Sequence, residues 1–138
     1  MISEVSCHIL KYNRSFCVKM RVPNMPLSRI ERLKDVFSSL AKEVFGRRIE
    51  KATVKALEIN HTCKFFIEMK EEAYDPAFIC IILMNLADAS VAMSYFKNGI
   101  SMPNESKRMA KMCFALYMDR NKIEMNKIKT EYAEVLKL

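Results

Sequence analysis

Apolar and polar residues alternate along two stretches of the chain, and this alternation is typical of strands with one buried face. The apolar face of the first stretch, SFCVKMRV, consists of Phe16, Val18, Met20 and Val22. The preceding VSCHILKY is the expected partner strand, with Asn13 and Arg14 at the turn, because Asn tolerates the left-handed backbone of tight hairpins. Residues 5–22 are therefore predicted to form a β-hairpin. It ends at Pro23, since proline cannot donate to a ladder.

The second alternating stretch is HTCKFFIEMK, and its apolar face consists of Cys63, Phe65, Ile67 and Met69. We expect a strand here. Between the two stretches, apolar residues recur at three- and four-residue intervals over residues 30–45, which predicts an amphipathic helix. Ser28 and Glu31 are spaced as a capping box at its start, and Gly46 supplies a stop. Residues 47–58 fit either a second short helix or a loop with a strand.

The most apolar stretch is YDPAFICIILMNLADASVAM, residues 74–93. Asp75 is a good N-cap and Pro76 a good first helical residue. The apolar pattern that follows is too long for one strand. The sequence therefore predicts a buried central helix at about 76–93, with Asp75 in a structural role as its cap.

Polar residues interrupt this helix and argue against a membrane span. A span needs about 20 apolar residues, whereas Asn85, Asp88 and Ser90 break this stretch. An aspartate at the bilayer centre costs about 2.5–3.5 kcal/mol on insertion scales. We expect Asn85 and Asp88 to form a narrow polar edge with a structural role. There, the Asp88 carboxylate would meet backbone N–H groups of a neighbouring loop.

The last third of the chain has weaker patterns. Residues 97–108 are expected to form a loop, and MCFALYM is expected to be a strand. A turn at 119–122, a short partner strand KIEM and a terminal helix TEYAEVLKL capped by Thr130 complete the prediction. The predicted class is α+β, with the order β-β-α-(α)-β-α-β-β-α.

Composition narrows the class of protein. The chain has 138 residues, which suits one domain over 1–138, and a net charge of +7, which favours acidic partners such as nucleic acid. Its five cysteines include no C-x-x-C pair, and we expect them to be reduced thiols of an intracellular protein. The sequence predicts no metal site and no cofactor.

A series of motifs then follows one family's order. VKMRVP leads into Glu31, Arg32 and Leu33; CKFFIEM follows; and the central helix ends in LADASVAM. The span from about Ser15 to Glu131 resembles the central part of an RNase PH domain. It is most similar to the RNase PH-like ring subunits of the eukaryotic RNA exosome, in which a buried helix ends L-A-D-A-G-I-P-M. The resemblance implies an RNase PH-like α+β fold.

The same resemblance implies a subunit without catalysis. Phosphorolytic members hold phosphate with a Gly-Gly-Thr-Arg turn before the buried helix, and here the turn reads EEAYDPAF. Its carboxylates would repel phosphate, so no catalytic residue carries over. The resemblance implies a structural subunit of an RNA exosome core, partnered by other RNase PH-like subunits. Such a subunit acts in 3′–5′ RNA processing and decay, rRNA processing included, in nucleus, nucleolus and cytoplasm.

RNA itself is a candidate partner, because phosphate contact needs only positive charge within reach. The candidate RNA-binding residues are Arg14, Lys19, Arg21, Arg47, Arg48 and Lys51. Each of them also fits an ordinary solvated surface charge.

Two alternatives stay open. The chain fits a small stand-alone interaction protein, such as a viral or parasite factor, that binds a partner protein through a methionine-rich surface of Met102, Met109, Met112 and Met118. It also carries Cys63 near His61 and Cys7 near His8, which are candidate pairs for nucleophilic catalysis. Rapid alkylation of Cys63 would favour an enzyme.

Overall fold

Four antiparallel strands form one sheet in the order β1-β2-β4-β3. The computed structural model describes residues 4–95 and 104–136. The strands are β1 (Val5–Ile9), β2 (Ser15–Arg21), β3 (Ile49–Leu57) and β4 (Thr62–Met69). β4 lies between β2 and β3, so the two strands joined through a helix are not neighbours in the sheet.

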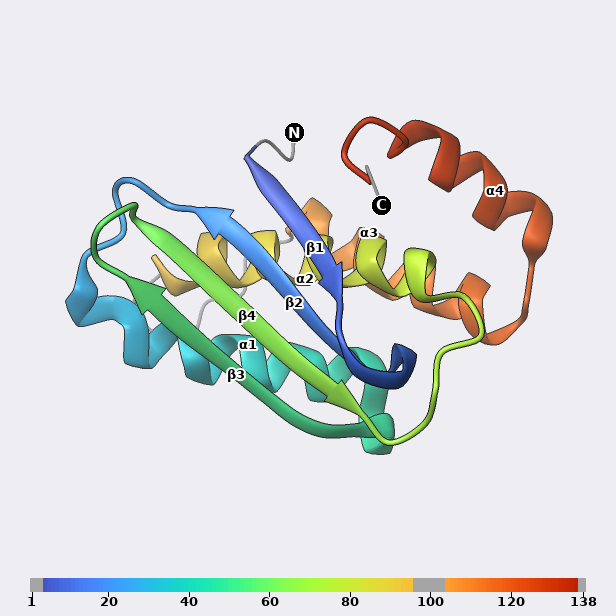
Figure 1. Cartoon of the computed structure of the whole chain (residues 1–138), viewed down its shortest axis with the longest axis horizontal. Helices are drawn as coiled ribbons and strands as arrows, with labels where there is room; N and C mark the ends of the chain where they lie inside the picture. Colours follow the sequence, from blue (N-terminus) through green and yellow to red (C-terminus); the bar gives the residue numbers. More distant parts are fainter. Residues whose placement is uncertain (1–3, 96–103, 137–138) are drawn as a thin grey trace.

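The first two helices along the chain cover one face of this sheet, and the last two pack against the second helix (Figure 1). They are α1 (Ile30–Phe45), α2 (Pro76–Ser94), α3 (Glu105–Met118) and α4 (Lys122–Glu131). α1 packs on β3, α2 packs on β1 and β2, and α3 packs against α2 on the side away from the sheet. The α+β class is therefore confirmed.

The predicted hairpin is confirmed. β1 and β2 pair in antiparallel register, with Cys7 opposite Val18. A short 3-10 turn, η1 (Lys11–Asn13), connects them, and Tyr12 and Asn13 have φ values of 56° and 53°. Asn accepts this left-handed conformation at low cost, which is why the turn forms here.

Residues 47–58 contain both of the alternatives that the sequence allows, a short helical turn and a strand. A 3-10 turn, η3 (Gly46–Arg48), follows α1, and β3 begins directly after it. Gly46 has a φ of 61°, in the left-handed region that favours glycine, so the predicted stop is confirmed. The start of α1 differs from the prediction. Ser28 lies in a second 3-10 turn, η2 (Leu27–Arg29), and no side chain caps α1, so there is no capping box.

The central helix is confirmed. The Asp75 carboxylate accepts a hydrogen bond from the backbone N–H of Phe78 at 3.2 Å, and Pro76 opens the helix. α2 is long and apolar enough to cross a membrane by length and composition alone. However, 72% of its most apolar window is buried inside the fold. It lies between the sheet and α3, which accounts for its near-complete apolar surface.

The last third of the chain corrects the prediction. MCFALYM belongs to α3, and KIEM begins α4, so neither is a strand. Thr130 caps nothing, because it lies inside α4, whose N-cap is Asn121. The turn predicted at 119–122 forms over residues 119–121, and Lys122 already belongs to α4. The predicted loop 97–108 falls outside the described residues up to 103, and α3 begins at Glu105. The strand pair expected from the RNase PH resemblance is therefore not formed by this segment.

Candidate nucleic-acid interface

The sheet has one face that no helix covers in the described part of the chain, and we call it the open face (Figure 1). Along each strand the core residues alternate with residues that point to this side. On the two inner strands the open face consists of Ser15, Cys17, Lys19, Arg21, Thr62, Lys64, Phe66 and Glu68. On the edge strands it consists of Ser6, His8, Lys51, Thr53, Lys55 and Leu57.

Three lysines form a row across the open face. The strand register places Lys19 opposite Lys64, and Lys64 opposite Lys55. Residues directly opposite on antiparallel strands have Cβ atoms about 4.5–5.5 Å apart, and like charges there are destabilising. Among the residues that the structure describes, none of the three forms an ion pair. Folding therefore brings three positive charges together without a counter-charge.

A second row lies directly beside the lysines. It consists of His8, Cys17, Phe66 and Thr53, one residue from each strand. Phe66 is half-buried, although the other strand phenylalanines, Phe16 and Phe65, point into the core. Burial raises the pKa of the Cys17 thiol, and the positive charges of Lys19 and Lys64 act against that rise. The lysine row therefore makes the potential positive at the centre of the open face.

Ion pairs mark two corners of the open face. Arg21 lies 3.4 Å from Glu4, and Arg14 lies 3.8 Å from Glu68, with all four side chains well exposed. Exposed pairs of this kind contribute about 0–1 kcal/mol to stability. These two ion pairs do not involve the lysine row, whose charge at the centre of the open face stays uncompensated.

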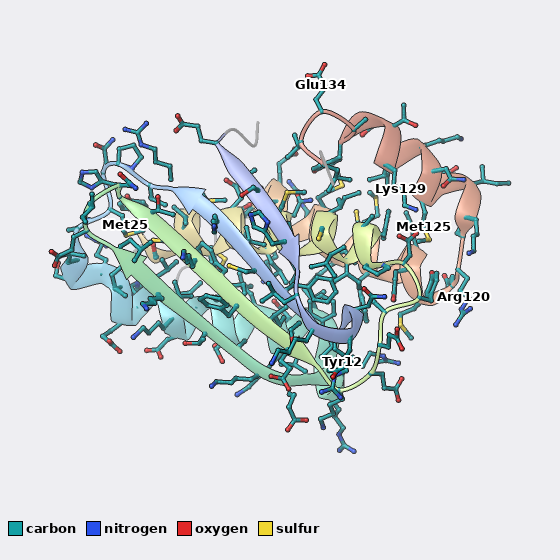
Figure 2. All side chains as sticks on the ribbon, viewed as in Figure 1. Tyr12, Met25, Arg120, Met125, Lys129 and Glu134 are labelled. Atoms are coloured by element: carbon teal, nitrogen blue, oxygen red, sulfur yellow. The ribbon has the colours of Figure 1, made fainter. Side chains whose placement is uncertain are left out.

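A hollow of about 260 Å³ opens on this face next to Phe66. Its lining residues are Leu10, Ser15, Phe16, Lys51, Thr53, Phe66, Ile67 and Glu68. Figure 2 shows Tyr12 at the end of the sheet where β1 and β2 connect, and Met25 at the opposite end. Tyr12 is 78% exposed.

The structure brings together three of the six predicted RNA contacts. Lys19, Arg21 and Lys51 lie on the open face. Arg14 lies at the sheet end, in the connection between β1 and β2. The other two, Arg47 and Arg48, lie on the η3 turn after α1, where both are exposed.

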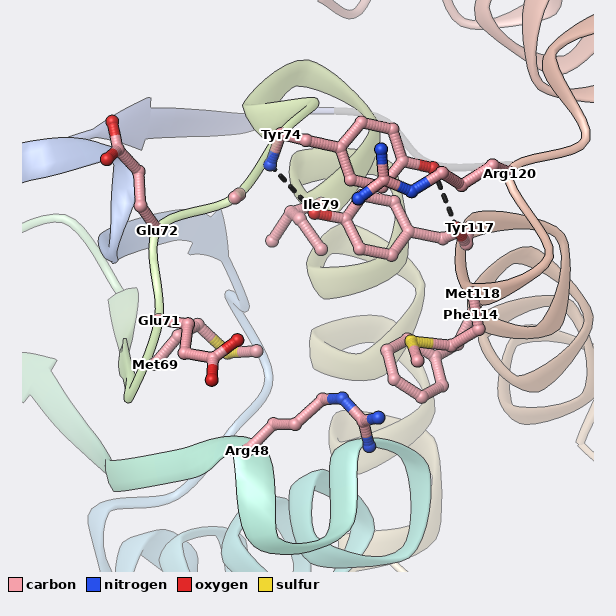
Figure 3. Close-up of a pocket in the computed structure, with 11 residues that line it drawn as sticks. Arg48, Met69, Glu71, Glu72, Tyr74, Ile79, Phe114, Tyr117, Met118 and Arg120 are labelled. Carbon is pink, nitrogen blue, oxygen red and sulfur yellow. Dashed lines mark hydrogen bonds between the residues drawn. The ribbon is translucent and has the colours of Figure 1, made fainter.

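Arg48 faces a different hollow, of about 230 Å³, between α3 and the connection from β4 to α2 (Figure 3). Its guanidinium carbon lies 5.8 Å from the centre of the Phe114 ring. Tyr74 and Tyr117 stack in the same hollow with centroids 4.4 Å apart, and Arg120 lies 4.3 Å above the Tyr74 ring. Cations and neighbouring rings already cover these aromatic faces.

Two hydrogen bonds fix that second hollow in place. The Tyr74 hydroxyl donates to the backbone oxygen of Tyr117 at 2.7 Å, and the Tyr74 backbone N–H donates to the Tyr117 hydroxyl at 3.2 Å (Figure 3). The Tyr74 hydroxyl also lies 3.5 Å from the Met125 sulfur. The cluster thereby attaches α3 and α4 to the start of α2.

The polar residues of α2 contact the C-terminal helices. Asp75 pairs with Lys129 of α4. The Asn85 amide donates to the Tyr132 hydroxyl at 3.0 Å and to the Ile81 carbonyl at 2.9 Å. Asp88 accepts a hydrogen bond from the Ser106 hydroxyl of α3. The expected partner of Asp88, a loop backbone N–H, is therefore replaced by a helix side chain.

The cysteine and histidine pairs have the wrong environment for an activated thiol. Cys63 is buried and His61 is an exposed turn residue with a φ of 50°. Burial raises the pKa of Cys63, which lowers the thiolate fraction. Cys7 points into the core toward Cys80, and a hydrogen bond with Cys80 raises its pKa, as does burial. In the described part of the chain, no three His, Cys, Asp or Glu side chains gather to hold a metal ion.

The residues that sequence reasoning missed are Lys55, Lys64 and Phe66. Lys64 and Phe66 were visible as the non-core positions of HTCKFFIEMK, but their neighbours across the sheet were not. Lys55 lies in residues 47–58, which fit either a short helix or a loop with a strand, so no sequence signal places it beside Lys64. No family model, no curated protein sequence and no solved structure matches this chain.

Proposed function

We propose that this chain binds single-stranded RNA across the open face of its sheet, as a non-catalytic component of an RNA-processing assembly. The observation that carries the proposal is the row of Lys19, Lys64 and Lys55. Their mutual repulsion lowers stability, and a phosphate backbone along the row would neutralise it.

The neighbouring row favours a single strand over a duplex. Single-stranded nucleic acid presents bases that stack on aromatic side chains, histidine included, while cations follow the backbone. Phe66 and His8 lie in the row next to the lysines, so both kinds of contact are within reach of one strand. A paired duplex has no free base face to place on Phe66.

Charge-matched variants test this proposal. The open-face variant combines Lys19→Ala, Lys55→Ala and Lys64→Ala. The control variant combines three substitutions on helices, Lys34→Ala, Lys42→Ala and Lys127→Ala. Fluorescence anisotropy with a labelled eight-nucleotide RNA measures affinity against salt. Each lost phosphate contact reduces the salt slope by about 0.7, so the open-face variant loses about 2 in slope and about 100-fold in affinity at 0.1 M salt. Equal losses in the two variants would contradict the proposal.

The role in an exosome-like assembly is a separate part of the proposal. It is supported by the motif series that β2, α1, β4 and α2 carry in the family's order, whereas helices α3 and α4 replace the strand pair of the resemblance. Gentle purification followed by native mass spectrometry tests it. Recovery with RNase PH-like chains is the expected result, and recovery alone would contradict it.

A protein partner is the second candidate, and one observation favours it. Of the predicted methionine surface, Met112 and Met118 of α3 are 46% and 43% exposed, Met109 is partly buried against the core, and Met102 lies outside the described residues. Ile123 of α4 is 72% exposed. Exposed methionines suit adaptable protein contacts. If purification instead recovers one unrelated protein whose binding is lost in Met112→Lys and Met118→Lys, this candidate is favoured over the assembly role.

A further inference from the structure

We infer that the hollow beside Phe66 holds one base of the bound RNA and selects cytosine over uracil through the Glu68 carboxylate. This inference rests on the proposed RNA binding and adds a substrate preference to it. It starts from the position of the hollow, which opens on the open face between β2, β4 and β3.

The distances across the sheet allow one nucleotide to contact both the lysine row and the Phe66 ring. Lys64 and Phe66 are two residues apart on β4, a separation of about 6.5–7 Å along a strand. A backbone that runs along the lysine row therefore passes directly beside the ring. A base turned from that backbone meets the face of Phe66 and then the hollow of about 260 Å³ behind it.

The polar groups of the hollow differ in what they can recognise. An ionised carboxylate only accepts hydrogen bonds, whereas the hydroxyls of Ser15 and Thr53 both donate and accept. Glu68 is kept near cations, with Arg14 at 3.8 Å from its Oε1 atom and Lys51 opposite it on β3. In the described part of the chain, Oε2 makes no hydrogen bond, so it is available as an acceptor.

Cytosine and uracil are the same size, but they differ in the group that they present to a hydrogen-bond acceptor such as the Glu68 carboxylate. Cytosine carries an amino group at N4 that donates to a carboxylate, and uracil carries a carbonyl oxygen at the same place, which a carboxylate repels. A base in the hollow with position 4 of its ring toward the Glu68 carboxylate, and N3 turned away from it, would therefore bind as cytosine and be rejected as uracil.

The experiment compares the affinities of two eight-nucleotide RNAs, all-uracil and all-uracil with one central cytosine, for the full chain. The wild type is expected to favour the cytosine-containing RNA by about tenfold. Glu68→Gln adds an amide donor that suits uracil, so the ratio should fall to about twofold or less. Glu58→Gln, an exposed residue in the β3–β4 turn, is the control and should keep the ratio.

Phe66→Leu separates stacking from selection. This substitution should lower the affinity for both RNAs by about tenfold, because stacking is tolerant of base identity. Equal binding of the two RNAs by the wild type, or a cytosine preference that survives Glu68→Gln, would overturn the inference and leave the proposed RNA binding intact. No binding of either RNA would overturn both. Because Glu68 is 42% exposed, Glu68→Gln is expected to fold, and circular dichroism checks this.

Discussion

The lysine row predicts that one charge-removing substitution makes the free protein more stable. Lys64 is the middle member and lies opposite both Lys19 and Lys55. Lys64→Gln keeps the length and polarity of the side chain and removes both repulsions. The expected result is a higher melting temperature together with weaker RNA binding.

The magnitude follows from Coulomb's law. Ammonium groups on opposite positions lie about 7 Å apart, and each pair then repels by about 0.6 kcal/mol in water. At 0.01 M salt the screening length is about 30 Å, so the two pairs together cost about 1 kcal/mol. For a chain of 138 residues this corresponds to about 3–5 °C in melting temperature. At 0.5 M salt most of the gain should disappear.

Thermal denaturation followed by circular dichroism, at both salt concentrations, measures the effect. Lys42→Gln is the control, because Lys42 is exposed in the last turn of α1, where a cation is favourable. That variant should be neutral or destabilised by up to about 0.5 kcal/mol. If Lys64→Gln is no more stable than Lys42→Gln at low salt, or if its gain in stability does not depend on salt, then the three lysines do not repel one another as the strand register implies.

Three further predictions concern the rest of the fold. Burial raises the pKa of Glu43, but Lys107 and Lys111 of α3 lower it by more, so the net shift is downward. The ion pairs of Glu43 therefore stabilise the fold above the usual carboxyl pKa, and this stability is lost as the pH falls through the lowered pKa. Glu43→Gln should thus lower the melting temperature by about 2–4 °C at pH 7 and not at pH 3; an equal loss at both would contradict this. Tyr132→Phe should cost about 1–3 kcal/mol in urea denaturation, since the side-chain oxygen of buried Asn85 loses the hydroxyl that donates to it, while its amide nitrogen keeps the Ile81 carbonyl; a cost below about 0.5 kcal/mol would be too small for that bond. Cys63 should react slowly with iodoacetamide at pH 7.5, because burial raises its pKa; rapid labelling would restore the Cys–His hypothesis.

The first two-thirds of the fold could be predicted because strong local patterns agree with the tertiary structure. The period-two faces of β2 and β4 are the buried faces, and the proline and aspartate signals of α2 are its real start. The start of α1 could not be predicted, because the backbone after Pro26 forms a 3-10 turn first. Ser28 then lies too early to cap the helix.

The sequence predicts strands where α3 and α4 form, because the apolar residues of these helices do not lie on one face. In α3 the buried residues Ala110, Cys113 and Tyr117 have helical spacing, but exposed Met112 lies between the first two and exposed Met118 follows the last. The resulting run resembles a strand. The real signals were the caps Asn104 and Asn121, each of which accepts hydrogen bonds from the first turn of its helix.

The candidate site was only partly within reach of the sequence. Lys19 and Arg21 were found, because alternation assigns each residue of one strand to a face. The lysine row needs the register between three strands, and β4 lies between two strands that are joined through α1. No pattern along a single chain segment carries that information.

The most direct test of RNA binding on the open face is an NMR titration of the labelled protein with an eight-nucleotide RNA. Binding on the open face should give the largest backbone amide shifts at Lys19, Lys55, Lys64 and Phe66, with small changes in α3 and α4. Shifts concentrated in α3 and α4, or no shifts at RNA concentrations well above the protein concentration, would contradict it.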